Sequence, residues 1–422
     1  MKKVRVGVLG AHRGRTMIGY CKQADNAELV AVCDKAPYEL EKVKREAGDL
    51  PVTYYESFDE FLKHDMDAVV LANYANEHAP FAIRCLEAGY HVFSEVLPFQ
   101  TMAEAVALAE AVEKSGKIYA YGENYCWMAA PREMRRLYRD DRIGELEYAE
   151  CEYVHNCEPI WHEITYGEPD HWRNNMYSTF YCTHSLGPIL HATGLRPVKV
   201  TGMESSLNRR RFNTGSRAAN LGMELVTLAN GAIVKSIHGG LYKNSVWYCM
   251  YGDKGRMESA REDANAGGHD RVYVNADAFP GDYDTPDKVE TYLPAKRDKR
   301  SIGFGHGGSD FYSMYYFIER IRGDETADVI GVYEALDMCM CGHFAFRSIL
   351  EDGRPMEIPD LRDPAQRDRW RYDTACTDPK TAGDMLLPTQ KGGTPDIPLS
   401  VYADVKRKWE AFLAKREAEE TE

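Results

Sequence analysis

Residues 4–14 read Val4-Arg-Val-Gly-Val-Leu-Gly10-Ala-His-Arg-Gly14, and this stretch decides the fold of the first third of the chain. The alternating pattern from Val4 to Leu9 is typical of a β-strand, and a helical pattern follows directly after Gly10. Glycines at a strand-to-helix turn let the backbone approach a pyrophosphate that helix N-terminal amides bind. The stretch therefore predicts the first βαβ unit of a dinucleotide-binding domain.

Further β-type runs alternate with helical patterns up to about residue 125. We expect strands at residues 29–33, 68–72, 91–93 and 118–121, and the clearest amphipathic helix at residues 102–114. This alternation is typical of a parallel sheet of the Rossmann type, so residues 1–125 are predicted to form an α/β nucleotide-binding domain.

Asp34 ends the second predicted strand, 24 residues after Gly10. A carboxylate there can accept hydrogen bonds from ribose hydroxyls and repels a 2′-phosphate, so the cofactor is predicted to be NAD rather than NADP. The glycine pattern is one residue short of a full G-x-G-x-x-G, and His12 stands where a second glycine is usual. From this pattern alone, Gly10 and Gly14 could also form only a tight turn.

A second domain is expected from residue 126 to residue 350. Longer β-type runs at residues 147–154, 198–203, 223–228 and 232–238 are separated by turn signals, which predicts an α+β domain with a mostly antiparallel open sheet. We expect long loops at residues 261–305 and helices at residues 311–322 and 332–350. Residues 351–422 are predicted to form a strap and a terminal helix that pack back on the other domains.

The composition excludes several classes of partner. The chain has 422 residues, with 52 Lys and Arg against 66 Asp and Glu, so its net charge of −14 argues against nucleic acid or an anionic membrane surface. No apolar run approaches the length of a membrane span, and the N-terminus lacks a signal-type core, so a cytoplasmic location is expected. The 11 cysteines include no Cys-x-x-Cys pair, which favours reduced thiols, and no histidine pair has metal-ligand spacing, so no metal site is predicted.

Two motifs resemble the Gfo/Idh/MocA oxidoreductase family: Asn73-Tyr-Ala-Asn-Glu-His78, and Glu95-Val96-Leu97-Pro98 followed by Thr101 at a helix start. In ordinary dehydrogenases of that family, a lysine and a proline follow the glutamate, and the lysine assists proton transfer from the hydroxyl that is oxidised. Here Val96 and Leu97 stand at these places. Valine cannot hold or relay a proton, so the resemblance points away from the usual dehydrogenase mechanism.

The Glu-Val pair is similar to glycoside hydrolase family 109, the NAD-dependent glycosidases of the same superfamily. Further matches follow in order along the chain: Glu123-Asn124, Tyr153-Val-His155, His171-Trp172-Arg173, Tyr181-Cys-Thr-His184-Ser-Leu-Gly187-Pro188 and Gly305-His306-Gly-Gly-Ser-Asp310. Phe304, directly before the last of these motifs, stands where the family has another glycine.

The resemblance implies three sets of site residues. The residues implied to bind NAD are Gly10, His12, Arg13, Gly14, Asp34, Asn73, His78, Glu95, Asn124, Trp172 and Arg173. Those implied to contact the substrate are Glu123, His155, Tyr181 and His184, and those implied to be catalytic are Tyr153, Tyr181, His184 and His306.

The implied reaction is a redox-assisted hydrolysis of a small glycoside. Tightly held NAD takes hydride from C3 of the sugar, a base removes the acidified C2 proton, the aglycone leaves from C1, water adds, and the hydride returns, so no cofactor is consumed. Tyr153 or Tyr181 can act as the base if the pKa of its phenol is lowered. His306 can protonate the leaving oxygen and deprotonate water, while His184 lies near the oxidised carbon.

Two other functions stay open on the sequence. One is a sugar or cyclitol dehydrogenase with net hydride transfer, in which His184 or Tyr181 replaces the missing lysine. The other is a catalytically silent sensor of sugar and NAD. The histidines also have structural interpretations, since His306 lies in a glycine-rich loop and His184 at a helix start. By analogy with the family, a homodimer or homotetramer is expected.

Overall fold

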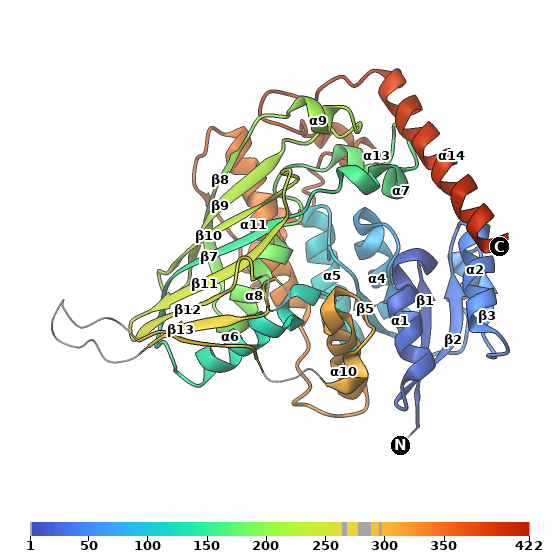
Figure 1. Ribbon diagram of the computed structural model, residues 1–422, viewed down its shortest axis with the longest axis horizontal. Coiled ribbons are helices and arrows are strands. Elements are labelled where there is room, and N and C mark those ends of the chain that lie inside the picture. Colours follow the sequence, from blue (N-terminus) through green and yellow to red (C-terminus); the bar gives the residue numbers. More distant parts are fainter. Residues whose placement is uncertain (1, 264–267, 277–287, 295–297, 422) are drawn as a thin grey trace.

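The computed structural model of the chain describes residues 2–263, 268–276, 288–294 and 298–421, which form two β-sheets (Figure 1). The first sheet has six strands in the order β3-β2-β1-β4-β5-β6, and all of its pairs are parallel. Its strands are β1 (Val4–Leu9), β2 (Ala27–Cys33), β3 (Thr53–Tyr55), β4 (Ala68–Leu71), β5 (His91–Ser94) and β6 (Tyr119–Tyr121). The predicted Rossmann-type fold is confirmed, although β3 was not expected.

Helices connect these strands: α1 (Ala11–Gln23), α2 (Pro37–Ala47), α3 (Phe58–Phe61), α4 (His78–Glu87) and α5 (Met102–Ser115). The turn from β1 to α1 requires glycine, because Gly10 has φ of 95° and a Cβ there would lie 2.4 Å from the backbone carbonyl carbon of Ala72. Helix α5 begins with a capping box, in which Thr101 and Glu104 satisfy each other's backbone amides.

The second sheet has nine strands in the order β14-β13-β12-β11-β7-β10-β9-β8-β15, and only its β7–β10 pair is parallel among the described strands. Its strands are β7 (Leu146–Val154), β8 (Pro197–Glu204), β9 (Leu221–Leu228), β10 (Ile233–Gly239), β11 (Ser245–Gly252), β12 (Gly255–Ser259), β13 (Val272–Asn275), β14 (Glu290–Tyr292) and β15 (Met356–Glu357). The predicted mostly antiparallel sheet is therefore confirmed.

The expectation of loops throughout residues 261–305 is wrong in part. Strands β13 and β14 extend the sheet there, but both are short and lie among polar, glycine-rich and proline-rich residues that hide their pattern. Residues 264–267, 277–287 and 295–297 of this segment lie outside the described part of the chain.

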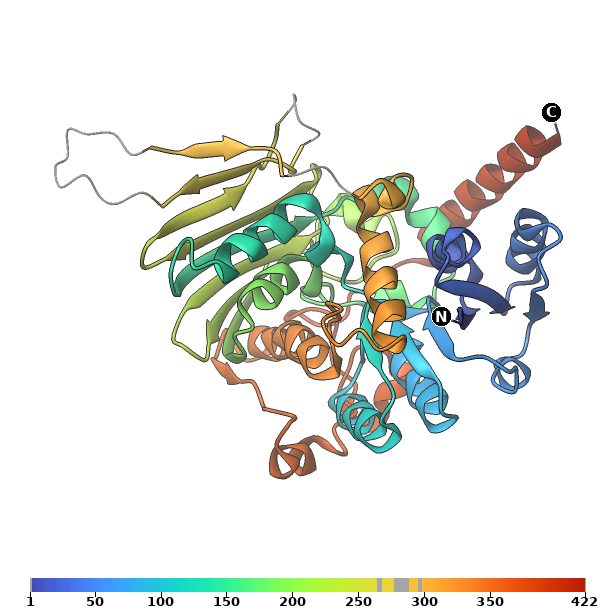
Figure 2. The same cartoon turned by 90° about the horizontal axis from the view of Figure 1, so that it is seen from below.

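Helices cover one face of the second sheet. Helices α8 (Thr183–Thr193) and α11 (Val332–Leu350) pack on this face, and α6 (Ala129–Arg139) packs against α8 (Figure 2). Helix α10 (Ser309–Ile321) lies between this domain and the first, where it contacts α1. The two helices predicted near residues 311 and 332 are thus confirmed.

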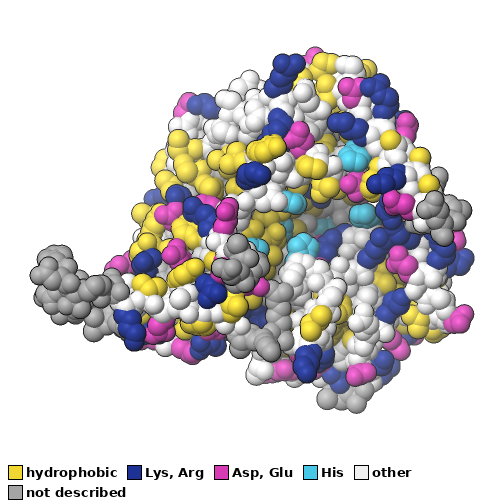
Figure 3. Space-filling model, viewed as in Figure 1, with side chains coloured by type: hydrophobic (Ala, Val, Ile, Leu, Met, Phe, Trp, Pro, Cys, Tyr) yellow, Lys and Arg dark blue, Asp and Glu magenta, His cyan; other side chains and the backbone are white. Residues whose placement is uncertain are grey.

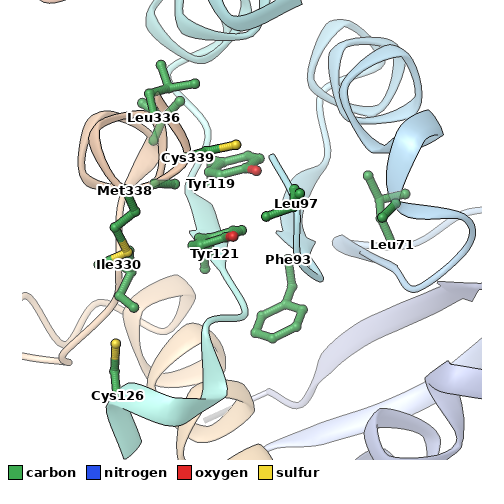
Figure 4. Packing of buried hydrophobic residues seen from close by; sticks show 14 of the residues in the cluster. Leu71, Phe93, Leu97, Tyr119, Tyr121, Cys126, Ile330, Leu336, Met338 and Cys339 are labelled. Carbon is green, nitrogen blue, oxygen red and sulfur yellow. The ribbon is translucent and has the colours of Figure 1, made fainter. Parts of the chain in front are cut away.

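The cores of the two domains are continuous. Figure 4 shows Tyr119 and Tyr121 of β6 beside Cys339 and Met338 of α11, and all four residues are buried. The amide of Tyr121 also donates a 2.8 Å hydrogen bond to the carbonyl of Ile330. Because β6 is covered in this way, a shared apolar layer fixes the first sheet against the second domain.

Residues after the second sheet run back over both domains. They form the helices α12 (Pro364–Trp370), α13 (Pro379–Ala382) and α14 (Leu399–Thr421). Arg367 of α12 binds the carboxylate of Glu113 in α5 through two nitrogens, at 2.6 and 2.7 Å. The last helix, α14, extends from the second domain toward α2 (Figure 1).

No helix in the described part of the chain is long and apolar enough to cross a membrane. The cysteines form no disulfide, and all of them are buried except Cys157, which is partly exposed.

Candidate functional site

A cavity of about 510 Å³ lies at the carboxyl ends of β1, β2 and β4. Gly10, Asp34 and Asn73 line it at the ends of these strands, and Trp172 and Arg173 of the 3-10 helix η4 (Trp172–Asn175) line it from the second domain. In a doubly wound sheet, ligands bind at the carboxyl edge where the strand order reverses, here between β1 and β4.

The polar groups of this cavity fit a dinucleotide. Asp34 accepts hydrogen bonds from the amides of Ala11, at 2.7 Å, and Ala36, at 2.9 Å, so its carboxylate is fixed beside the glycine turn. Burial raises the pKa of Asp34, and the two amides oppose this shift. The side-chain oxygen of Asn73 and the indole nitrogen of Trp172 are buried without a protein partner, as expected of groups that meet a polar ligand.

Not every residue implied to bind the cofactor lines the cavity. His78 is buried behind it, where its Nδ1 donates a 2.9 Å hydrogen bond to the carbonyl of Leu97, and burial lowers the pKa of His78 to about 4. His78 therefore holds the turn after β5. Gly14 allows α1 to lie against Val8, since a Cβ there would be 2.6 Å from its side chain. His12 does line the cavity, with its Nδ1 3.1 Å from a carboxylate oxygen of Glu39.

Arg13 connects the cavity to the second domain. Its guanidinium donates to Glu95 at 2.7 Å and to both oxygens of Asp310 at 3.1 and 3.2 Å. Asn124 also donates to Asp310, at 2.8 Å. Burial opposes the ionisation of Asp310, but the hydrogen bonds and charges of His306 and Arg13 hold the pKa of its carboxyl well below the ordinary value. Glu95 and Asn124 thus act through these partners and do not line the cavity.

Asp310 also orients His306. The Nδ1 atom of His306 lies 3.1 and 3.2 Å from the two oxygens of Asp310, while 40% of the side chain is exposed. His306 has φ of 51°, and Gly307 and Gly308 continue this left-handed turn into α10. The imidazole is therefore held by a buried carboxylate, and its Nε2 atom is left to exchange a proton with a ligand.

A second histidine–carboxylate pair lies across the site. His184, in the first turn of α8, has its Nδ1 2.8 Å from Oε1 of Glu123, which is fully buried. The same oxygen accepts a 3.2 Å hydrogen bond from the backbone amide of Tyr125. Because Glu123 fixes one ring nitrogen of His184, its other nitrogen can exchange a proton with a substrate.

The two pairs meet around Tyr125, a residue that the sequence analysis did not identify. The ring centre of Tyr125 lies 4.5 Å from that of His184, 5.1 Å from Tyr153 and 6.2 Å from His306. Figure 3 shows several histidine side chains around a hollow between the two lobes of the molecule. The only signal in the sequence was that Tyr125 directly follows Glu123-Asn124.

The predicted substrate-side residues also gather here. Tyr181 stacks on His184 with ring centres 5.7 Å apart, and the guanidinium of Arg173 lies 5.6 Å from the ring of Tyr181. The hydroxyl of Tyr153 lies 3.2 Å from Nδ1 of His155. A tyrosine base would need a lowered phenol pKa, but burial raises the pKa of both Tyr153 and Tyr181; at Tyr181 the charge of Arg173 opposes this rise.

Cys157 is a second residue near this site that the sequence analysis did not identify. Its sulfur lies 3.3 Å from Nδ1 of His155. Burial opposes thiolate formation, but His155 and the guanidinium groups of Arg173 and Arg211 lower the pKa of Cys157. Among the described residues, no group of three or more His, Cys, Asp or Glu side chains is placed to hold a metal ion.

Comparisons with known proteins find similar sequences for both parts of the chain. The family model described as an oxidoreductase family with an NAD-binding Rossmann fold matches residues 4–123, and the model of the glycosyl hydrolase 109 C-terminal domain matches residues 254–370. The alpha-N-acetylgalactosaminidase of Shewanella oneidensis is 24% identical over an alignment of 404 residues, which covers 88% of this chain and 87% of that protein. Glycosyl hydrolase family 109 protein 1 of Shewanella sp. (strain ANA-3) is 24% identical over 406 residues, with 89% and 87% covered.

Solved structures share the fold. The aldose-aldose oxidoreductase of Caulobacter crescentus, complexed with glycerol, has a TM-score of 0.67 and 20% identity, with 85% of this chain and 100% of that chain covered. The WlbA dehydrogenase of Bordetella pertussis, in complex with NADH and UDP-GlcNAcA, has a TM-score of 0.64 and 18% identity, with 85% and 99% covered.

Fold and site together define a two-domain enzyme with an NAD-binding Rossmann domain. Residues 4–123 resemble the NAD-binding domain of the Gfo/Idh/MocA oxidoreductase family, and over most of its length the chain is similar to glycoside hydrolase family 109 proteins.

Proposed function

We propose that the protein is an NAD-dependent glycoside hydrolase that cleaves a small glycoside through transient oxidation at C3. The observation that carries this proposal is the convergence of two histidine–carboxylate pairs, His184–Glu123 and His306–Asp310, around Tyr125. One such pair would be enough for a simple dehydrogenase. With two pairs, one can exchange a proton with the C3 hydroxyl and the other with the glycosidic oxygen.

Bound NAD supplies the acceptor, and later the donor, of the hydride at C3. Gly10, Asp34, Asn73, Trp172 and Arg173 are the residues that would hold it, since they line the cavity. The site proper adjoins this cavity, because Arg13 lines the cavity and also binds Asp310, the partner of His306.

We assign the proton of the C3 hydroxyl to His184, which Glu123 orients. Val96 is a partly buried apolar residue and leaves no lysine to take this proton. Of the two tyrosines we assign the base at C2 to Tyr181, because the guanidinium of Arg173 lies 5.6 Å from its ring and opposes the rise that burial causes in the pKa of its phenol.

We assign the C1 side of the reaction to His306. As the C2 proton leaves, a C1–C2 double bond forms and the C1–O bond breaks, and His306 gives its proton to the departing oxygen. Water then adds at C1 and returns a proton to His306, while C2 regains a proton. Bonds and protons balance over the cycle, and acid–base catalysis of this kind contributes roughly 10²- to 10⁴-fold to the rate.

The experiment that tests this function incubates the purified protein with aryl α- and β-glycosides without added cofactor. We expect continued aglycone release while the absorbance of reduced nicotinamide stays flat. Stoichiometric accumulation of NADH with an oxidised sugar would instead identify the alternative dehydrogenase, and binding of a glycoside of the panel without formation of either product would favour a silent sensor. His306→Ala should strongly slow aglycone release from glycosides with poor leaving groups, whereas His64→Ala, next to Tyr55 in the first domain, should leave it unchanged.

Self-association is part of the proposal. Apolar side chains are exposed along β8, β9, β10 and β11, namely Met203, Leu225, Ile233 and Tyr251. An exposed apolar face of this kind fits the expected homodimer or homotetramer, which sedimentation analysis would test.

A further inference from the structure

The C-terminal helix contributes to the nucleotide cavity. Trp409 and Leu413 of α14 line the same cavity as Gly10 and Asp34. Residues four apart lie on the same face of a helix, so the face of α14 that carries Trp409 and Leu413 is directed to this cavity. The sequence indicates a helix with an apolar side here but does not reveal what that side covers.

Helix α14 is firmly anchored on the second domain. The hydroxyl of Tyr402 donates a 3.0 Å hydrogen bond to the carbonyl of Gly215, and Tyr402 and Val405 are buried. The helix backbone also lies against the turn after α7 (Trp161–Thr165), because a Cβ at Gly167 would be 2.4 Å from the amide nitrogen of Lys406. The first turns of α14 therefore hold the rest of the helix in place over the cavity.

Aromatic side chains connect α14 to the first domain. The ring centre of Trp409 lies 5.0 Å from that of Tyr166, just after α7, and the phenols of Tyr166 and Tyr38 of α2 interact with each other across the cavity lining. All three side chains line the cavity. They form a cover, hereafter the aromatic cover (Tyr38, Tyr166 and Trp409), that spans from the nucleotide-binding domain to the C-terminal helix.

We infer that Trp409 and Leu413 cover the adenosine half of bound NAD, next to Asp34, and that this contact retains NAD on the protein between turnovers. Aromatic rings bind the π-face of a nucleobase, and release of the base would require the aromatic cover to part while Tyr402 holds the helix down. Retention suits a reaction in which the hydride returns to the sugar. The inference rests on NAD binding in this cavity, and the glycosidase chemistry is not needed for it.

The test measures NAD release directly. The wild type and the variants Trp409→Ala, Leu413→Ala and Glu410→Ala are loaded with NAD⁺ and freed of excess by gel filtration, and the NAD that stays bound is quantified over time by chromatography. We expect release about 10- to 100-fold faster for Trp409→Ala, the range for loss of one ring that stacks on a base. Leu413→Ala should release NAD several-fold faster, and Glu410→Ala, exposed on another side of α14, should match the wild type.

Release from Trp409→Ala at the wild-type rate would overturn the inference. If that variant does not fold, Leu413→Ala decides, and release no faster than from Glu410→Ala overturns it equally. A protein that retains NAD through Trp409 but cleaves no glycoside supports this inference and contradicts the proposed function. A protein that cleaves glycosides but releases NAD at the wild-type rate after Trp409→Ala or Leu413→Ala supports the proposed function and contradicts this inference.

Discussion

Asp310 is the residue whose replacement most sharply tests the assignment of His306. Asp310→Asn keeps the shape of the side chain and removes its charge. In the wild type an oxygen of this carboxylate lies 3.1 Å from Nδ1 of His306, and the carboxylate also accepts hydrogen bonds from Arg13 and Asn124. The variant should therefore leave His306 in place but poorly oriented.

The size of the effect follows from these contacts. A hydrogen bond to a charged group contributes about 1.5–3 kcal/mol, so loss of the His306–Asp310 bond should lower kcat/KM roughly 10- to 150-fold. The loss should be largest for glycosides with poor leaving groups, which need a proton from His306, and small for nitrophenyl glycosides. His306→Ala should lower the rate further, by about 10²- to 10⁴-fold.

The assay is kcat/KM for a series of aryl glycosides whose leaving groups differ in pKa, measured for each single variant and for the double variant. Because Asp310 acts through His306, the double variant should be no slower than His306→Ala alone. Asp298→Asn, which removes a carboxylate paired with Arg300 in the same region, is the matched control and should change little. Multiplicative losses in the double variant, or equal losses for all leaving groups, would refute the reasoning.

Three further predictions concern the first domain. Asp34→Ala should weaken NAD binding by about 10- to 100-fold and reduce the preference of the protein for NAD over NADP. Calorimetric titration with both cofactors measures this, and an unchanged preference would contradict the assignment of Asp34 to the ribose hydroxyls. Gly10→Ala should destabilise the fold by about 1–3 kcal/mol and abolish NAD binding, because its Cβ would meet Ala72; a variant with wild-type Tm and NAD affinity would be inconsistent with that contact. Burial raises the pKa of Glu104 from 4.5 to about 7, so the stability that its carboxyl contributes is complete below pH 4.5 and is lost as the pH rises through 7. Glu104→Gln, which retains an acceptor for the cap, should therefore be more stable than the wild type at pH 8, by an amount on the order of 3 kcal/mol at most, and closer to it at pH 5; denaturant unfolding that shows no gain at pH 8 would contradict this.

The fold could be predicted from sequence where strands are long or fully buried. Strand β4 is a continuous buried apolar run, and β1 and β5 are buried at all but one position each, because both faces of a parallel sheet are covered. Strands β3 and β14 have three residues each and contain partly or fully exposed positions, so no apolar pattern marks them. Their existence depends on pairing with β2 and β13, which is a tertiary effect.

The sequence predicts which residue types form the site, but it does not predict most of the pairings between them. His306 and Asp310 are four residues apart, so their pairing is local and lies within the recognised motif. By contrast, 61 residues separate Glu123 from His184 and 297 separate Arg13 from Asp310, and only the packing of the two domains brings these groups together. The raised pKa of Tyr153 likewise depends on burial, which the sequence does not specify.

The central claim, cleavage through transient oxidation at C3 and loss of the C2 proton, is tested most directly by hydrolysis in deuterium oxide with NMR analysis of the released sugar. The account predicts deuterium at C2 of the product, aglycone release and no net NADH. A product that carries only hydrogen at C2 would contradict it, because neither direct displacement at C1 nor simple dehydrogenation at C3 breaks the C2–H bond.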